Sequence, residues 1–380
     1  MIPYGRQSIS DEDIASVTDV LRSDFLTQGS VVPAFEQAIA DYCHVPHAVA
    51  CSNGTAALHL ACLALEISAG DLVWISAISF VASANCARYC GAEVDFVDID
   101  ATTGNLSVEA LQLKLAEAQH TGRLPKALIV VHLAGQPCDM DEIASLCRQH
   151  NIAIIEDACH ALGAHYKDKA VGYCEFSALT VFSFHPVKPI TTAEGGMVTT
   201  RDDILADRLR LYRSHGITRE PDLLELPAPG GWYYEQQVLG FNYRLTDLQA
   251  ALGLSQIKRL DYFIDTRNQL ACRYNEKLFS LSVSPLQQKQ DRKNGYHLYV
   301  IRVSAEKRAG LFAALRHAGI GVNVHYIPIP AQPYYRALGF DPSDYPGAQA
   351  YYESVISLPL FAELTEVQQD EVVRQLGLAL

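Results

Sequence analysis

The sequence predicts an α/β protein with a mostly parallel central sheet and a smaller α/β domain toward the C-terminus. Between about residues 40 and 200, short apolar runs alternate with helical patterns, which is typical of parallel strands covered by helices on both faces. The chain has 380 residues, which is enough for one large and one small domain. We expect a large domain over residues 1–255, with an N-terminal arm, and a small domain over residues 256–380.

Several apolar runs in the first half have the length of buried strands. They span residues 48–51, 72–75, 94–97, 127–131, 152–155, 179–182 and 197–200. Helices are expected between most of them, over residues 55–66, 82–90, 108–117 and 140–149. In open α/β sheets, ligands bind outside the carboxyl ends of the strands. The residues that follow each strand are therefore the candidates for a functional site.

The second half of the chain begins with a surface excursion. Residues 221–231 are rich in proline and glycine, which predicts an exposed loop. A long helical pattern follows over residues 245–263. The apolar runs 299–303 and 322–326 then predict strands of the small domain.

Composition excludes several classes of function. The net charge of −13 argues against a surface for nucleic acid or anionic membrane. No apolar run approaches the roughly 18 residues that span a bilayer, and the N-terminus lacks the pattern of a signal peptide. Ten scattered cysteines without a Cys-x-x-Cys motif indicate reduced thiols in a cytoplasmic protein.

Two pairs of residues resemble parts of a metal site. Cys86 and Cys90 share an expected helix face, and His44 and His47 are close in sequence. Neither pair has the further ligands that a metal needs, so no metal is expected.

Lys188 lies between Pro186 and Pro189, behind an apolar run that reads as a buried strand. The two prolines restrict the backbone under this lysine. Lysine is the usual Schiff-base residue because burial readily lowers its pKa. Most lysines are surface charges, so the role of Lys188 depends on what the neighbouring strand ends provide.

Four strand ends provide complementary groups. Gly54 and Thr55 open a helix whose free amides suit a phosphate, although an ordinary capped helix start has the same pattern. Asp157 and His160 follow another strand, where Asp157 could instead be a helix cap and His160 a packed histidine. Phe80 follows a third strand, where a core aromatic is the alternative. Ser183 and Lys188 follow the fourth.

Pyridoxal 5′-phosphate needs all of these groups together. The lysine would form a Schiff base with the cofactor, and the carboxylate would pair with the pyridine nitrogen, so that the ring acts as an electron sink. The aromatic side chain would stack on the ring. The order of these groups along the chain indicates this cofactor more specifically than any single group does.

At this point the chain resembles the DegT/StrS family of sugar aminotransferases, which have the fold-type-I aspartate-aminotransferase architecture. The resemblance runs essentially from end to end. It is carried by residues 53–58, 80–85, 97–100, 156–158, 183–184 with Lys188, 194–196, 240–245 and 325–328.

The resemblance implies a role for each candidate residue. Lys188 would bind the cofactor, Asp157 would partner the ring nitrogen and His160 would lie near the ring hydroxyl. Phe80 would stack on the ring. Gly54, Thr55 and Ser183 would hold the phosphate, with Asn242 arriving from the neighbouring subunit of a homodimer. The residues that resemble nucleotide-sugar contacts are Tyr4, Asp24, Phe25, Leu26, Thr27, His325, Tyr326, Ile327 and Pro328.

Within the family, residues 2–7, 26–29 and 184–196 are most similar to the branch that uses L-glutamate to aminate C4 of a UDP-4-keto-6-deoxy-N-acetylhexosamine, a step toward pseudaminic acid. Some relatives that remove a sugar hydroxyl carry histidine at the lysine position, so Lys188 favours amino transfer.

Four alternatives stay open at this stage. The acceptor could be another UDP- or dTDP-sugar, or the reaction could be a dehydration. A dehydrogenase is disfavoured because no Gly-x-Gly-x-x-Gly motif occurs, and the Lys188/Asp157 pair argues against a catalytically silent binding protein.

Overall fold

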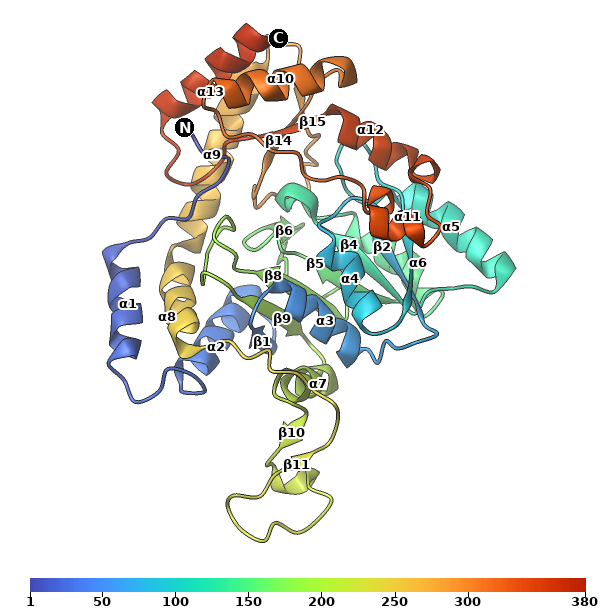
Figure 1. Cartoon of the computed structure of the whole chain (residues 1–380), viewed down its shortest axis with the longest axis vertical. Helices are drawn as coiled ribbons and strands as arrows, with labels where there is room; N and C mark the ends of the chain where they lie inside the picture. The colour runs from blue at the N-terminus through green and yellow to red at the C-terminus, as the bar shows by residue number, and fades with distance from the viewer.

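A seven-stranded sheet forms the centre of the computed structural model, which describes residues 1–380 (Figure 1). Its strands are β1 His47–Cys51, β2 Leu72–Ser76, β3 Glu93–Val97, β4 Ala127–Val131, β5 Ala153–Asp157, β8 Leu179–Ser183 and β9 Gly196–Thr200. Their spatial order is β1-β9-β8-β5-β4-β2-β3. From β8 to β3 all neighbours pair in parallel, whereas β9 runs antiparallel to β1 and β8. The predicted α/β class and every predicted strand of this sheet are confirmed.

Helices cover the sheet on both faces (Figure 1). They are α2 Val31–Cys43, α3 Gly54–Ala64, α4 Ala82–Tyr89, α5 Val108–Thr121, α6 Met140–Arg148, α7 Asp203–Arg213 and α8 Asp247–Gln256. The first helix, α1 Asp11–Leu21, packs against α8 instead of the sheet. A cluster of 41 buried side chains packs α3 and α4 against the strands, and separate clusters do the same for α2 with α8 and for α5 with α6. Cap residues set the helix starts: Ser107 accepts from Ala110 N, and Asp202 accepts from Leu205 N.

The C-terminal part contains a small antiparallel sheet of β12 Ser284–Pro285, β14 Tyr299–Arg302 and β15 Val355–Leu358. Around it lie α9 Leu260–Leu278, α10 Ala305–His317, α11 Pro333–Ala337, α12 Pro346–Ser354 and α13 Glu366–Ala379. This part has its own cluster of 18 buried apolar side chains. The division of the chain after residue 255 stays a prediction.

The remaining elements are short. They are β6 His165–Tyr166, β7 Lys169–Ala170, β10 Ile217–Thr218, β11 Glu235–Gln236 and β13 Arg292–Lys293, with single 3-10 turns η1 Leu133–Gly135, η2 Pro221–Leu223, η3 Ile257–Arg259, η4 Ile329–Ala331 and η5 Pro342–Asp344. The loop that carries β10 and β11 projects beyond α7 (Figure 1). Residues 221–231 are almost all exposed there, which confirms the predicted surface excursion.

One expectation for the second half was confirmed in part and one was wrong. Residues 247–256 and 260–263 of the helix expected over residues 245–263 are helical, but the η3 turn separates α8 from α9. Residues 322–326 form no strand: Asn323 makes a single bridge to Ser357, with backbone N–O distances of 3.3 and 2.8 Å. The apolar pattern was misread because the side chains from Asn323 to Tyr326 line a cavity instead of a sheet core.

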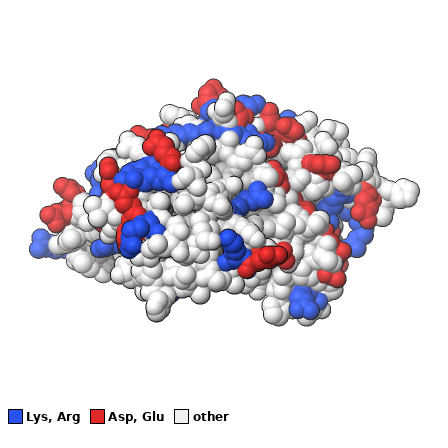
Figure 2. Space-filling view, turned by 90° about the horizontal axis from the view of Figure 1, so that it is seen from above, with Lys and Arg blue, Asp and Glu red and all other residues white.

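The charged side chains are mixed on the face that Figure 2 shows, where Lys and Arg alternate with Asp and Glu and neither sign forms a continuous patch. None of the helices is both long enough and apolar enough to cross a bilayer.

Candidate active site

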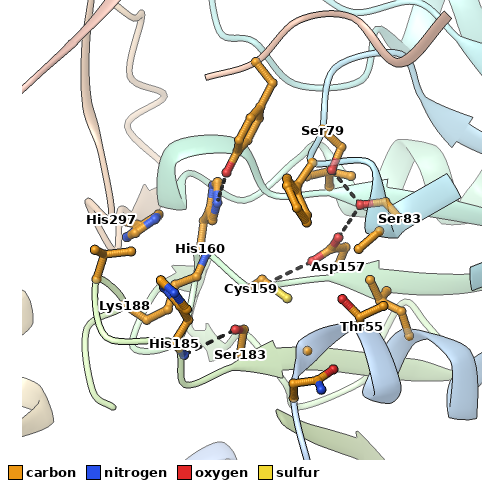
Figure 3. Close-up of a pocket in the computed structure, with 18 of the residues that line it drawn as sticks. Thr55, Ser79, Ser83, Asp157, Cys159, His160, Ser183, His185, Lys188 and His297 are labelled. Carbon is orange, nitrogen blue, oxygen red and sulfur yellow. Dashed lines mark hydrogen bonds between the residues drawn. The ribbon is translucent and has the colours of Figure 1, made fainter. Parts of the chain in front are cut away.

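A cavity of about 870 Å³ opens at the carboxyl ends of β1, β2, β5 and β8 (Figure 3). Residues 323–326 and Tyr4 complete its wall from the far side. Ten of the predicted site residues line it together: Tyr4, Gly54, Thr55, Phe80, Asp157, His160, Ser183, Lys188, His325 and Tyr326. Groups up to about 320 residues apart in sequence are thus brought to one place by the parallel sheet.

Two glycines allow the start of α3 to lie against β8 and β9. A Cβ on Gly54 would lie 2.9 Å from the Ser183 Cβ, and a Cβ on Gly196 would lie 2.3 Å from the Asn53 carbonyl oxygen. Both distances are too short for any side chain, so glycine is required at both positions. The Asn53 side chain caps α3 by accepting from Ala56 N at 2.8 Å, and the amides of Gly54 and Thr55 have no acceptor within the helix. This corner suits an anion.

Asp157 is the last residue of β5, not the first residue after it, and it is buried. Its Oδ2 accepts from Ser83 Oγ at 2.6 Å, and its Oδ1 accepts from Cys159 N at 3.2 Å. Ser83 in turn lies 2.6 Å from Ser79 Oγ, so a short chain of hydroxyls holds the carboxylate (Figure 3). A buried carboxylate is costly without a cationic or donor partner, and Asp157 keeps acceptor capacity on the side of the cavity.

Lys188 follows β8 in a turn closed by its amide, which donates to His185 O at 2.9 Å. Its side chain lines the same cavity as Asp157. Burial lowers the pKa of the Lys188 amine, while the nearby Cys159 and Asp157 act in the opposite direction. A lysine with a lowered pKa is a better nucleophile and base near neutral pH.

His160 is held as a neutral ring. Its Nδ1 accepts from Ala134 N at 3.2 Å, which leaves the ring proton on Nε2, 3.1 Å from the Tyr326 hydroxyl. Burial lowers the pKa of His160 well below its ordinary value, and the Lys188 charge adds to this effect. His160 is therefore a fixed hydrogen-bond donor on the cavity wall. Its ring centroid lies 4.4 Å from that of His297.

Phe80 is 57% exposed although it is aromatic, because its ring faces the cavity, 6.1 Å from the Tyr326 ring. An exposed aromatic face over a polar cavity is suited to stacking on a planar ligand.

Seven predicted residues do not line this cavity: Asp24, Phe25, Leu26, Thr27, Asn242, Ile327 and Pro328. Phe25 and Leu26 are exposed in the turn before α2. Asn242 forms a bridge with Ser214 at the base of the projecting loop, and it was expected to act in another subunit. The roles of all seven residues stay predictions.

Sequence reasoning missed several lining residues. The most informative are Ser79, Ser83, His59, Cys159, Tyr243 and His297. Ser79 lies in the bend before α4 and Ser83 in the first turn of this helix, so helical spacing does not predict their contact. Nothing in the sequence around His297 predicts that this residue lines the cavity, because His297 is far in sequence from the strands whose ends form the cavity.

The groups present fit pyridoxal phosphate. The cavity holds an amine of lowered pKa, a carboxylate with spare acceptor capacity, a helix start without acceptors for its first amides and an exposed aromatic face. These are the contacts that the amine-reactive aldehyde, the pyridinium nitrogen, the phosphate and the ring of this cofactor require.

Comparisons with known proteins agree with this fit. The model of the DegT/DnrJ/EryC1/StrS aminotransferase family matches residues 7–377. The chain is 38% identical over 369 residues to the UDP-4-amino-4,6-dideoxy-N-acetyl-beta-L-altrosamine transaminase of Campylobacter jejuni serotype O:2, covering 96% of this chain and 93% of that protein. It is 37% identical over 381 residues to the spore coat polysaccharide biosynthesis protein SpsC of Bacillus subtilis, covering 98% and 95%.

A solved structure extends the likeness to the fold. The PLP form of Spr1654 from Streptococcus pneumoniae superposes with a TM-score of 0.90 at 30% identity, covering 100% of this chain and 98% of that one.

Proposed function

This chain belongs to the DegT/DnrJ/EryC1/StrS aminotransferase family and is a pyridoxal phosphate-dependent nucleotide-sugar aminotransferase, and we propose a specific reaction for it. L-Glutamate is the amino donor. The acceptor is C4 of a UDP-4-keto-6-deoxy-N-acetylhexosamine, and the product is UDP-4-amino-4,6-dideoxy-N-acetyl-β-L-altrosamine, an intermediate of pseudaminic acid biosynthesis.

The observation that carries the proposal is the pairing of Lys188 and Asp157 at adjacent strand ends. β5 and β8 are parallel neighbours in the sheet, so both side chains reach one cavity. A lysine at this position supports amino transfer over removal of a hydroxyl.

The bound cofactor supplies an electron sink for the carbon that loses a proton. Lys188 Nζ takes this proton from the Cα of glutamate and, in the second half of the reaction, gives a proton to C4 of the sugar. The lowered pKa of Lys188 fits this work, because the amine must be neutral to accept a proton.

The other residues bind and orient. Asp157 holds the positive charge of the ring nitrogen, and Ser83 keeps the carboxylate in place through its 2.6 Å hydrogen bond. Gly54, Thr55 and Ser183 hold the phosphate at the start of α3. His160 keeps its Nε2 proton on the cavity side of its ring, and Phe80 covers the ring face.

The substrate assignment is supported by the similarity to the Campylobacter jejuni transaminase and by residues 184–196. SpsC is almost equally similar, so an aminotransferase for another UDP- or dTDP-4-keto sugar is the second candidate.

We propose three further properties with this function. The enzyme is a homodimer in which Asn242 completes the partner's phosphate site, and Tyr4, residues 24–27 and residues 325–328 contact the nucleotide sugar. The protein is cytoplasmic, which is supported by ten cysteines that form no disulfide.

Replacing the lysine tests the reaction. Lys188→Ala is expected to lower amino transfer by about 10⁴-fold, because it removes the group that moves the proton, and to abolish the visible absorbance of the lysine-bound cofactor. Lys258→Ala, which changes an exposed lysine without a hydrogen-bonded partner, should behave like the unchanged protein. A Lys188→Ala protein with normal turnover would contradict the assignment.

A substrate panel tests the acceptor. UDP- and dTDP-4-keto sugars are supplied with L-glutamate. The masses of the products are measured by mass spectrometry, and the configuration at the new amine is assigned by NMR. Release of 2-oxoglutarate matched to a 4-amino UDP-sugar of altro configuration supports the proposal. A faster reaction with a dTDP-sugar, or release of a deoxysugar without the amine, would overturn it.

A further inference from the structure

His297 lines the cavity but has no part in the proposed mechanism. It lies between β13 and β14, in the C-terminal part of the chain, and is only 4% exposed. Its Nδ1 is enclosed and has no hydrogen-bonded partner. A buried polar atom without a partner lowers the stability of the fold, so we expect the ring of His297 to have a use that outweighs this loss.

The contact that the His297 ring makes is with His160. The two ring centroids are 4.4 Å apart, with an interplanar angle of 48°, and both rings lie on the same side of the cavity as Lys188 (Figure 3). The Tyr326 ring is stacked on His160 as well, at 6.0 Å and 29°. Two aromatic side chains from the C-terminal part therefore pack against the ring of His160, which follows β5.

The segment that carries His297 is also bonded to the turn that holds His160. Ala134 N donates to His160 Nδ1 at 3.2 Å, and the Ala134 carbonyl accepts from Leu298 N at the same distance. Gly295 N donates to the next carbonyl of this turn at 3.0 Å. His160 and His297 are thus connected through the backbone of η1 as well as through their rings.

A buried arginine holds the other side of this segment. Arg267 on α9 is 2% exposed. Its Nη1 donates to the carbonyl oxygens of Tyr296, His297 and Leu360, at 3.2, 3.4 and 3.0 Å. A buried guanidinium is stable only where its donors find acceptors, so these bonds favour one position for the backbone at His297.

We propose that His297 is a positioning residue for amino transfer: the face of its ring holds His160 so that the Nε2 proton of His160 points toward the ring hydroxyl of the cofactor. The inference rests on the proposed function, in which His160 faces the cofactor. Without His297, the His160 ring keeps its two hydrogen bonds but loses the packing that prevents it from tilting. A small misplacement of a group at a reacting centre slows the reaction.

The bound cofactor allows this hydrogen bond to be measured without turnover. A donor to the ring oxygen stabilises its negative charge most when the nitrogen between Lys188 and the cofactor has lost its proton, so the donor lowers the pKa of this nitrogen. The loss of one hydrogen bond to a charged group corresponds to about one pH unit. The pH midpoint of the visible absorbance of the lysine-bound cofactor therefore reports the position of His160.

The test compares two variants of the purified holoenzyme, each titrated by absorbance and assayed with L-glutamate. His297→Ala removes the ring, so the absorbance midpoint should rise by about one pH unit and kcat should fall about tenfold, while the KM for glutamate stays within about twofold. His297→Phe keeps a flat ring without the nitrogens, so the midpoint and kcat should stay near those of the unchanged enzyme. His317→Ala, which changes an exposed histidine of α10, is the control and should alter neither.

A third variant keeps the test decisive if His297→Ala fails to fold. His297→Gln fills more of the space but has no aromatic ring, and the same rise of the midpoint is expected. An unchanged midpoint in either variant would overturn the inference, and so would an equal loss of kcat in His297→Phe, which would show that a ring nitrogen and not the ring face is needed. An unchanged enzyme without cofactor absorbance and amino transfer would overturn the proposed function as well.

Discussion

Glu156 and Asp157 are consecutive buried acids on β5, but they face opposite sides of the sheet and have different surroundings. Glu156 Oε2 lies 2.7 Å from His132 Nε2, and its Oε1 accepts from Ser177 Oγ at 2.5 Å and Thr180 Oγ1 at 3.1 Å. Asp157 has Ser83 and the Cys159 amide as donors and lines the cavity.

The difference separates an acid that is enclosed by the protein from one that is available to a ligand. Glu156 has three hydrogen-bonded partners inside the protein and does not line the cavity, so no ligand in the cavity can reach it. The hydrogen-bonded partners of Asp157 orient it and leave room for a cation. Burial alone does not identify a functional acid; the acceptor capacity that remains on the cavity side does.

The strongest test of this comparison is Asp157→Asn. Amino transfer is expected to fall about 10³-fold, because a fixed charge opposite the ring nitrogen is lost, while the unfolding midpoint of the apoprotein changes little. Steady-state kinetics and urea unfolding measure the two effects. An Asp157→Asn enzyme with near-normal kcat would show that Asp157 is structural, like its neighbour.

The mirror test is Glu156→Gln. The free energy of unfolding should fall by about 3 kcal/mol, because one partner of a buried, hydrogen-bonded pair is removed. Activity per folded molecule, measured at low temperature, should stay within about twofold of the unchanged enzyme. A large loss of kcat without a loss of stability would break the comparison.

A smaller effect is expected when the supporting hydroxyls are removed. Ser83→Ala deletes a hydrogen bond to the Asp157 carboxylate, worth about 1.5 kcal/mol, so kcat should fall about tenfold. Thr180→Val deletes the corresponding bond to Glu156 and should cost about 1 kcal/mol of stability with unchanged kcat. If both variants lower kcat, or both lower only stability, then the two faces of β5 do not have separate roles in activity and stability.

The smallest effect is the acid dependence of stability. Burial raises the pKa of Glu156, but its hydrogen bonds from His132, Ser177 and Thr180 outweigh this and leave the pKa below its ordinary value. The stabilisation is therefore complete above the unfolded-state pKa of about 4.3, and it is lost as the pH falls through the lower folded-state value. Urea unfolding from pH 7 to pH 3 should show the gap between the unchanged protein and Glu156→Gln narrowing in acid. A constant gap would contradict this.

The strands, and the residues that converge on the cavity from their ends, could be read from the sequence. β4, for example, is Ala-Leu-Ile-Val-Val and is buried throughout, and such continuous apolar runs are typical of parallel strands covered on both faces. Lys188, Asp157 and Thr55 each follow or end a strand, so their convergence follows from the rule that ligands gather at the carboxyl ends of the sheet.

Other features could not be read in this way. Residues 322–326 have the apolar pattern of a strand, but their side chains close the cavity. The η3 turn between α8 and α9 contains no proline or glycine that would have predicted it from the sequence. His297 enters the cavity from the C-terminal part of the chain, and its distance in sequence from β5 hides the contact with His160.

The sequence by itself determined the class of the fold, the sheet and the identity of the cofactor, because these depend on local periodicity and on which residues end each strand. Only the tertiary structure decided which of two consecutive acids is available to a ligand and which serine holds it. Those facts depend on the side chains that other segments bring to each face of a strand or helix. The spacing of residues along the chain does not predict which distant segments come into contact.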